Sequence, residues 1–379
     1  MFLAKERATL AKFFPGLDED LIKIPLMERE NYNNSTHQAN PTIRLFGEFG
    51  GPKLLIPAKY GGMQVTPLDA LHIQRAIGSR SPSLAVAATM HHFTVAIIQE
   101  MMPPDDSGFD LFERVAKDNL FFSSGFAEGR TGSSIFQSHM QVKPVAGGLI
   151  ISGSKKPCTL SMSMDLMTAS VLLPALDGQG EEIALVVIPA DSPGIERRPF
   201  WKSFALTGTE SHEVVLNEVF VPEEYIYNMG SPNRFDKVVA RSFIWFELLA
   251  CAAYLGVSSA LVERVFLTKR GIPSERVALA TELESVMSAL QGLACSIVGN
   301  EKHDDLVAQA VFVRLFVQNV IERVAMGAAE LLGGMAFVES PEVAYLIASA
   351  RALAFHPPSR LSAAAGLDKY LSGEPLQIG

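Results

Sequence analysis

The period of the hydrophobic pattern changes twice along this chain, and that change limits the possible folds more than any other feature. Residues 1–121 and 231–379 carry apolar side chains at three- and four-residue steps, as amphipathic helices do. Residues 122–230 consist of short β-branched segments bounded by Gly, Pro and Asp, which predicts a small antiparallel barrel or sandwich. The sequence therefore predicts an α+β fold with an N-terminal helical domain, a middle β-domain and a C-terminal four-helix bundle.

The same pattern argues against a dinucleotide-binding α/β fold. The predicted strands do not alternate with helices, and no GxGxxG sequence opens a helix. Gly333 and Gly334 follow a helical segment, where glycine commonly terminates a helix. The 379 residues are 48% hydrophobic, which is enough for more than one core, and the net charge of −9 argues against a nucleic-acid partner.

No segment predicts a membrane span or a secretion signal. The longest apolar stretch, residues 239–256, is interrupted by Arg241 and Glu247, and the N-terminus lacks the apolar core of a signal peptide. We therefore expect a cytoplasmic protein without a membrane partner. The three cysteines are odd in number and widely spaced, so neither a disulfide framework nor a metal site is predicted, and buried thiols are expected.

A glycine- and serine-rich segment, AEGRTGSS at 127–134, predicts a binding loop. It is followed by GGLIISGSKKPCTLS at 147–161, which reads as a strand, a Gly-Ser-Lys turn and a closing threonine. Glycines let the backbone approach a bound group closely, and the hydroxyls and free N–H groups can hydrogen-bond to it. Alone, each segment is a weak signal.

Five blocks in the correct order resemble the acyl-CoA dehydrogenase superfamily over nearly the whole chain. They are LLIPAKYGG and the helices after it (54–87), AEGRTGSS (127–134), GLIISGSKKPCTLS (148–161), ALTGTESHEVVLNEVFVPEEYIY (205–227) and GAAELLGGMAFVESPEVAYLIASARA (327–352). The resemblance implies FAD held among the three domains and a homodimer or homotetramer. It also implies an acyl thioester, bound to CoA or a carrier protein, as substrate, and an electron-transfer flavoprotein or O₂ as electron acceptor.

The resemblance also implies which residues bind the cofactor. The backbone of Phe126 and Ala127 would meet the flavin edge, Ser133 would reach the flavin or its pyrophosphate, and Thr159 would face flavin N5. Glu330, Gly333 and Gly334 would contact the ADP half of a neighbouring subunit's FAD, and Arg270 would stand in for the family's arginine that binds the FAD pyrophosphate across the interface.

The chain departs from the family at the catalytic base, which must lie within reach of the substrate α-proton. The position of the usual glutamate is His356, followed by two prolines instead of Gly-Thr. In another branch the base lies on the helix that opens the C-terminal domain, and the aligned position here is Phe246, with Glu247 next to it. One helical residue turns by about 100°, so Glu247 would point elsewhere unless the register slips. His356 and Glu247 are the two candidate bases.

Three functions remain open on this basis. The first is α,β-dehydrogenation of an acyl thioester, which the five blocks favour. The second is a flavin monooxygenase of the same fold, which needs no carboxylate base. The third is a divergent, non-catalytic member that binds acyl groups or flavin or serves as a scaffold.

Overall fold

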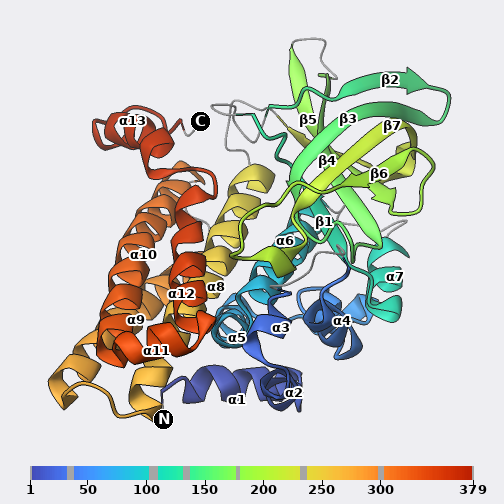
Figure 1. Cartoon of the computed structure of the whole chain (residues 1–379). Coiled ribbons are helices and arrows are strands. Elements are labelled where there is room, and N and C mark those ends of the chain that lie inside the picture. Colours follow the sequence, from blue (N-terminus) through green and yellow to red (C-terminus); the bar gives the residue numbers. More distant parts are fainter. Residues whose placement is uncertain are drawn as a thin grey trace.

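Two groups of helices flank a β-domain in the computed structural model, which describes residues 2–31, 38–101, 110–130, 137–175, 180–230, 237–297 and 303–377 (Figure 1). The first helical group contains α1 (Ala4–Phe13), α2 (Leu17–Lys23), α3 (Leu26–Arg29), α4 (Pro41–Glu48), η1 (Gly51–Lys53), η2 (Ala58–Tyr60), α5 (Pro67–Arg80), α6 (Pro82–Met101) and α7 (Asp110–Asp118). The second contains α8 (Lys237–Leu267), α9 (Pro273–Ser296), α10 (His303–Leu332), α11 (Gly334–Glu339), α12 (Pro341–Arg351), η5 (Ala352–Phe355) and α13 (Arg360–Leu371). The predicted helix–strand–helix order is confirmed.

The middle domain consists of two four-stranded sheets packed around a core of their own. Its elements are β1 (Phe122–Gly125), β2 (Gln141–Val145), β3 (Gly148–Cys158), β4 (Leu166–Pro174), β5 (Glu181–Pro189), β6 (Ile195–Arg198), η3 (Thr207–Thr209), β7 (His212–Pro222), η4 (Glu223–Tyr225) and β8 (Ile226–Gly230). The sheet orders are β1-β4-β5-β8 and β2-β3-β7-β6. Two features differ from the expectation: β1 pairs with β4 in parallel, and β8 was not predicted.

The segment between residues 31 and 63 is rich in Pro, Asn and Gly, a composition that predicts mostly loop, yet it contains α4. The helix begins with a strong local signal, because the Asn40 side chain accepts a hydrogen bond from Thr42 N and Pro41 occupies the first turn. Asn40 is fully buried, and its own N–H donates to Glu210 of the β-domain at 2.7 Å. This contact shows that the helix start is also fixed by tertiary structure.

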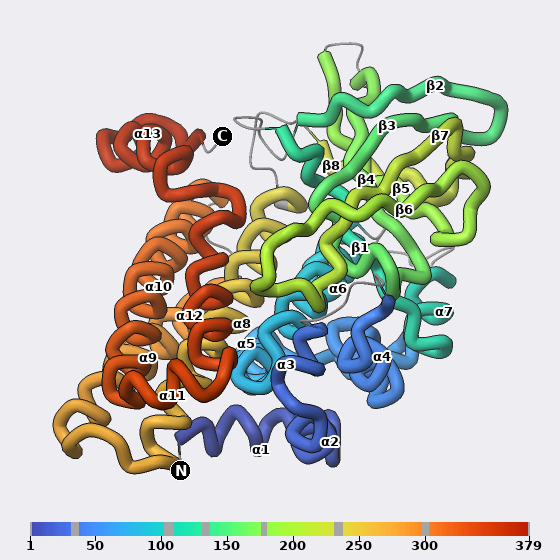
Figure 2. The backbone as a smooth tube through the Cα atoms, viewed as in Figure 1, coloured from blue at the N-terminus to red at the C-terminus, as the bar shows by residue number. Residues whose placement is uncertain are grey.

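The long helix α8 passes through the middle of the helical region, between α5 and α10 (Figure 2). It is long and apolar enough to cross a membrane, but 89% of its most hydrophobic stretch is buried inside the protein. A helix that is apolar on every face is typical of a core surrounded by other helices. Here α5, α6, α9, α10 and α12 supply those neighbours.

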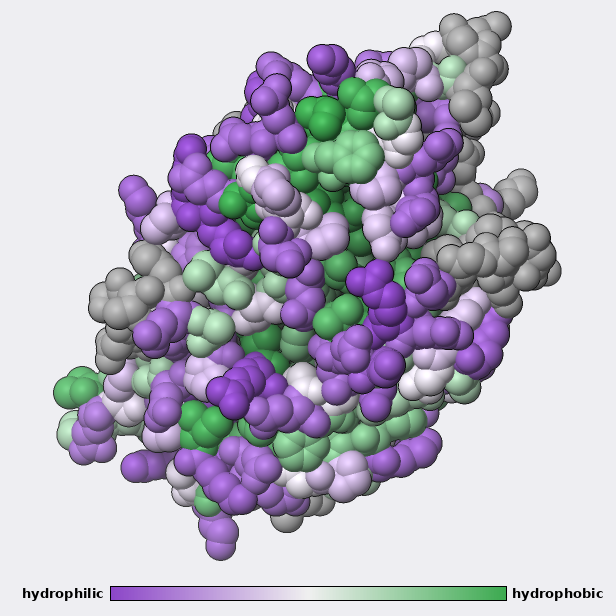
Figure 3. Space-filling model, turned by 90° about the vertical axis from the view of Figure 1, so that its right-hand side faces the viewer, coloured by the Kyte–Doolittle hydropathy of each residue, from purple (hydrophilic) through white to green (hydrophobic). Residues whose placement is uncertain are grey.

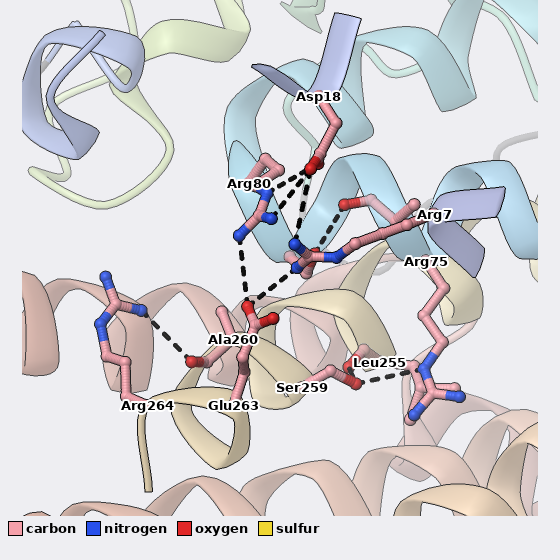
Figure 4. Close-up of polar contacts among 11 residues, drawn as sticks. Arg7, Asp18, Arg75, Arg80, Leu255, Ser259, Ala260, Glu263 and Arg264 are labelled. Carbon is pink, nitrogen blue, oxygen red and sulfur yellow. Dashed lines mark hydrogen bonds and ion pairs between the residues drawn. The ribbon is translucent and has the colours of Figure 1, made fainter. Parts of the chain in front are cut away.

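Four charged side chains from four helices join the N-terminal helices to α8 (Figure 4). Arg7 of α1 contacts Asp18 of α2 at 3.5 Å and Glu263 of α8 at 2.8 Å. Arg80 of α5 contacts the same two carboxylates, at 2.7 and 3.2 Å. Because each arginine contacts both carboxylates, the four helices are held in one arrangement.

Two glycines let α5 and α8 cross at very close range. A Cβ added at Gly78 would lie 2.2 Å from the Ala253 carbonyl oxygen, and one added at Gly256 would lie 2.4 Å from the Arg75 carbonyl oxygen. Both positions face backbone, which cannot move aside as a side chain can. The helices can therefore pack this closely only with glycine at both places.

We expect Gly256→Ala to destabilise the protein by about 1–3 kcal/mol or more, because the methyl group forces two helix backbones apart. The matched control is Gly292→Ala in α9, where nothing lies within 4 Å of an added Cβ. That change should stabilise by about 0.5–1 kcal/mol through helix propensity. Urea unfolding midpoints of the two variants test this, and equal shifts would contradict the close crossing.

On the face shown in Figure 3, charged and polar residues cover most of the surface, and apolar residues show in the recesses between them and at a few raised positions. Of the three cysteines, Cys158 and Cys251 are buried as expected, whereas Cys295 is exposed on α9. No group of His, Cys, Asp and Glu that could hold a metal ion occurs within the described residues.

Candidate active site

A cavity of about 690 Å³ lies where α6, α8 and the end of α12 meet the β-domain. Its volume is within the range of small-molecule and cofactor sites. The helical walls present Val86, Met90, Phe93, Ile97, Val239, Ser242, Phe243, Phe246, Tyr254, Ala348 and Ala352. The remaining wall includes Ser124, Phe126, Ala127, Glu128, Thr159, Trp201, Thr209, Ser211 and His356.

The apolar wall comes from one face of each of two helices. Val86, Met90, Phe93 and Ile97 of α6 are spaced by four, three and four residues, so they form one stripe along the helix. Phe246 of α8 meets this stripe, with its ring centroid 5.5 Å from that of Phe93 in an edge-to-face arrangement. The two helices therefore present aromatic and aliphatic side chains to whatever the cavity binds.

Glu128 is the single carboxylate among the described residues of the cavity wall, and its oxygens are occupied. Oε1 accepts from Lys155 Nζ at 2.8 Å and from the Ser138 hydroxyl at 2.9 Å. Oε2 accepts from the His139 backbone N–H at 3.0 Å and contacts His139 Nδ1 at 3.2 Å. Burial raises the pKa of Glu128, but the hydrogen bond and charge of Lys155, together with the hydrogen bonds from Ser138 and His139, outweigh burial, and the pKa is lowered. Glu128 is thus an ionised structural anchor for the buried Lys155.

Three hydroxyl groups in a row line the β-domain side of the cavity. Thr159 Oγ1 lies 2.9 Å from Ser211 Oγ, and Ser211 Oγ lies 2.7 Å from Thr209 Oγ1. Thr209 Oγ1 donates to the Leu206 carbonyl oxygen at 2.8 Å. All three side chains are buried, so this row of hydroxyls is a fixed part of the wall.

His356 and Tyr254, which both line the cavity, form a hydrogen-bonded pair with 2.7 Å between His356 Nε2 and Tyr254 Oη. Burial, with the nearby positive charge of Arg314, lowers the pKa of His356 to about 3. Burial raises the pKa of Tyr254. Both rings are therefore neutral at physiological pH, and His356 is too weak a base to keep a proton removed from a weak acid.

Glu247 does not line the cavity, although Phe246 beside it does. It is fully buried and paired with Arg314 of α10, with 2.9 Å between Oε1 and Nη1, while Oε2 has no hydrogen-bond partner. Arg314 also donates to the backbone carbonyls of Leu353 and His356. Burial raises the pKa of Glu247 to about 7 against the effect of Arg314. The pair fixes the segment that carries His356.

The structure brings together only part of the set expected to bind cofactor. Phe126, Ala127 and Thr159 line the cavity together with His356. Ser133 lies outside the described residues. The other four do not line the cavity and lie at the far end of the bundle, since α8 carries the chain roughly 30 Å from Phe246 to Leu267: Arg270, Glu330, Gly333 and Gly334. The resemblance implies that these four contact a neighbouring subunit's FAD, and this stays a prediction.

Sequence reasoning missed several residues of the cavity. Trp201, whose ring N–H donates to the Ala205 carbonyl at 2.9 Å, comes from the irregular segment before β7. Tyr254 comes from the middle of α8. Its position two turns after Phe246 places both on one helix face, and that spacing was a usable signal.

Comparison with known proteins identifies the family of this chain. Isobutylamine N-hydroxylase of Streptomyces viridifaciens is 43% identical over 378 residues, covering 98% of both chains. An acyl-CoA dehydrogenase relative, "putative acyl-CoA dehydrogenase YdbM" of Bacillus subtilis, is 24% identical over 58% of this chain and 55% of its own. The chain belongs to the acyl-CoA dehydrogenase superfamily. No protein-family profile matches it.

The superfamily fold is also seen in a solved structure. FMN-bound TdsC from Paenibacillus sp. A11-2 superimposes with a TM-score of 0.82, at 16% identity over 99% of this chain and 98% of that one. The chain therefore shares its fold with a flavin-binding protein.

The residues present fit a flavin. The isoalloxazine ring is a flat aromatic body with one polar edge, and the cavity wall contains both aromatic side chains (Phe93, Phe246 and Trp201) and the row of hydroxyls.

Proposed function

We propose that this protein is a flavin-dependent monooxygenase that N-hydroxylates a small primary alkyl amine with O₂. The observation that carries the proposal is the full-length 43% identity to an isobutylamine N-hydroxylase. The cavity supports it, because its one described carboxylate is already engaged by Lys155 and His139.

The charge balance of the cavity favours a neutral amine. An alkylammonium ion buried against Phe93, Phe246 and Met90 would lack a free counter-ion, which is costly. A neutral amine keeps its nitrogen lone pair, which is the nucleophile that N-hydroxylation requires. The branched aliphatic part of such an amine would pack against the α6 stripe.

The overall reaction balances as amine, O₂, NAD(P)H and a proton giving hydroxylamine, water and NAD(P)⁺. Reduced flavin supplies the activation of O₂, and a separate reductase would be the partner that reduces the flavin. The chain itself binds the amine in an apolar site, excludes water from it and holds His356 and Tyr254 as neutral hydrogen-bonding groups at its edge.

Thioester dehydrogenation has less support from the site. It requires a base at the substrate α-carbon, and Glu247 is bound to Arg314 outside the cavity while His356 has a pKa near 3. A carbon acid cannot be deprotonated efficiently by a group that is so weakly basic.

The test is an aerobic assay of the purified protein with a flavin reductase, NADH and either FAD or FMN. We expect isobutylamine and related amines of three to five carbons to yield hydroxylamines, detected by mass spectrometry. The control is the same mixture without this protein. The proposal fails if no amine is oxidised while an acyl-CoA bleaches the bound flavin anaerobically.

A further inference from the structure

One irregular segment between β6 and β7, residues 201–211, supplies part of the cavity wall, and we call it the wall segment. It contributes Trp201, Ser203, Ala205, Leu206, Thr209 and Ser211. The turn η3 inside it is flanked by Leu206 and Glu210, which both have a left-handed backbone, with φ of 60° and 57°. This conformation is unfavourable for residues with a Cβ and persists only where the surroundings hold it. The shape of the wall segment must therefore be fixed by contacts from outside it.

The first end of η3 is held by a buried tyrosine and a buried glutamate. The Leu206 backbone N–H donates to Tyr345 Oη of α12 at 3.0 Å, and this hydroxyl donates to Glu30 Oε2 at 2.6 Å. Glu30 also accepts from the Ser81 hydroxyl at 2.6 Å and from the Ser83 backbone N–H at 2.9 Å, at the junction of α5 and α6. Leu206 is thus connected through one tyrosine to both helical groups.

The second end of η3 is held by Glu210 and by the residue that begins α4. Glu210 Oε1 accepts from the Asn40 backbone N–H at 2.7 Å and from the Ser163 hydroxyl at 2.8 Å. Glu210 Oε2 accepts from the backbone N–H groups of Ser163 and Met162, at 2.8 and 3.2 Å. The Asn40 side chain donates to the Gly208 carbonyl inside the turn at 2.9 Å. A Cβ at Gly208 would lie 2.3 Å from Asn40 Nδ2, so the turn packs directly on the start of α4.

The residues that hold the turn are buried and do not line the cavity: Glu30, Asn40, Glu210 and Tyr345. We propose that these four are positioning residues, which fix the wall segment from behind and thereby limit the size of the amine that the cavity accepts. The N-terminal helices then control a wall that the β-domain supplies. The selection of an amine rests on the proposed function, whereas the fixing of the wall segment does not.

Tyr345→Phe tests the first end, because it removes the hydroxyl between Leu206 and Glu30 and keeps the ring. A loosened wall admits a larger substrate more easily. We therefore expect the ratio of kcat/KM for isobutylamine to that for benzylamine to fall about threefold to tenfold, as for loss of one hydrogen bond. The matched control is Tyr370→Phe on α13, which removes a hydroxyl that donates to Asp305 at 2.6 Å away from the cavity. Its ratio should equal that of the wild type.

Glu210→Asn tests the second end. Asparagine tolerates the left-handed backbone of this position, but its shorter side chain cannot keep the contacts of Glu210 with Asn40 and Ser163. We expect the ratio of the two kcat/KM values to fall as in Tyr345→Phe. Glu210→Gln keeps the length and one acceptor oxygen, so its ratio should lie between those of the wild type and Glu210→Asn.

Trp201 reports on the wall segment without amine or flavin. Its ring N–H donates to the Ala205 carbonyl within the same segment, at 2.9 Å. The chain has two tryptophans, so Trp245→Phe leaves Trp201 as the single one. In this background we expect acrylamide to quench Trp201 fluorescence more strongly in Tyr345→Phe and Glu210→Asn, and no change in Tyr370→Phe.

The two readouts separate this inference from the proposed function. The inference is overturned if the ratio of kcat/KM values stays at the wild-type value in both variants, even where both rates fall, because a purely structural role changes both amines equally. It is also overturned if the quenching of Trp201 is unchanged in both variants. If the wild type oxidises no amine while quenching rises as expected, the wall segment is held as described and the proposed function falls.

Discussion

Arg314→Met is expected to cost about 3–5 kcal/mol of folding free energy at pH 9, because it leaves the buried Glu247 carboxylate without a partner. The variant also loses the two hydrogen bonds that Arg314 donates to the backbone carbonyl oxygens of Leu353 and His356. Urea unfolding, with the midpoint and slope measured separately, gives the size of the loss.

The loss should depend on pH in a direction that follows from Glu247. Its folded pKa of about 7 lies above the ordinary value of 4.5, so the folded state binds an extra proton between these values and wild-type stability falls as pH rises through them. Without Arg314 the folded pKa rises further, so the variant continues to lose stability above pH 7 where the wild type no longer does. The gap between the two proteins should be smaller at pH 6 than at pH 9.

The double variant Glu247→Leu with Arg314→Met is the matched control. It removes both charges and fills the space with apolar atoms, which is often nearly neutral for buried pairs. It should regain most of the stability and lose the widening gap at high pH. Two results would contradict this role of the ion pair. One is a double variant no more stable than Arg314→Met, and the other is a stability difference between wild type and Arg314→Met that is equal at pH 6 and pH 9.

The sequence was sufficient for the parts of the fold that have a strong local signal. The helices α5, α6 and α8 carry long periodic apolar patterns, and seven of the strand segments are bounded by turn residues, so local and tertiary preferences agree. The missed elements are short and depend on distant contacts. Helix α4 is fixed by the bond between Asn40 and Glu210, 170 residues apart, and β8 by its pairing with β5.

In the candidate site, too, residues with a distinctive local sequence could be predicted, and residues positioned by distant contacts could not. Phe126, Ala127 and Thr159 line the cavity because they lie in or beside loops whose local sequence is distinctive. Trp201 could not be found, since its position depends on how an irregular segment packs against other parts of the chain. The position of Glu247 could be predicted only in part. The 100° step from Phe246 indicates that the Glu247 side chain points away from the cavity, but it does not predict the ion pair with Arg314 of another helix.

Phe246 differs from its neighbour Glu247, because Phe246 lines the cavity and Glu247 does not. Its ring lies between Phe93 and His356, with centroids 5.5 and 5.9 Å away. All three rings belong to residues that line the cavity. The proposed small amine should therefore be selected partly by the volume that Phe246 occupies.

Phe246→Ala is expected to reduce kcat/KM for isobutylamine about tenfold to two-hundredfold, because a small substrate loses the wall it packs against. A bulkier amine such as benzylamine should lose less or gain, so the ratio of the two kcat/KM values should shift by at least about tenfold. Phe316→Ala on α10, 46% exposed and not among the lining residues, makes the same change away from the cavity and should leave the ratio as it is. Steady-state kinetics with both amines decides the matter: if the two rates fall by the same factor in Phe246→Ala, the α8 wall stabilises the fold but does not select the substrate.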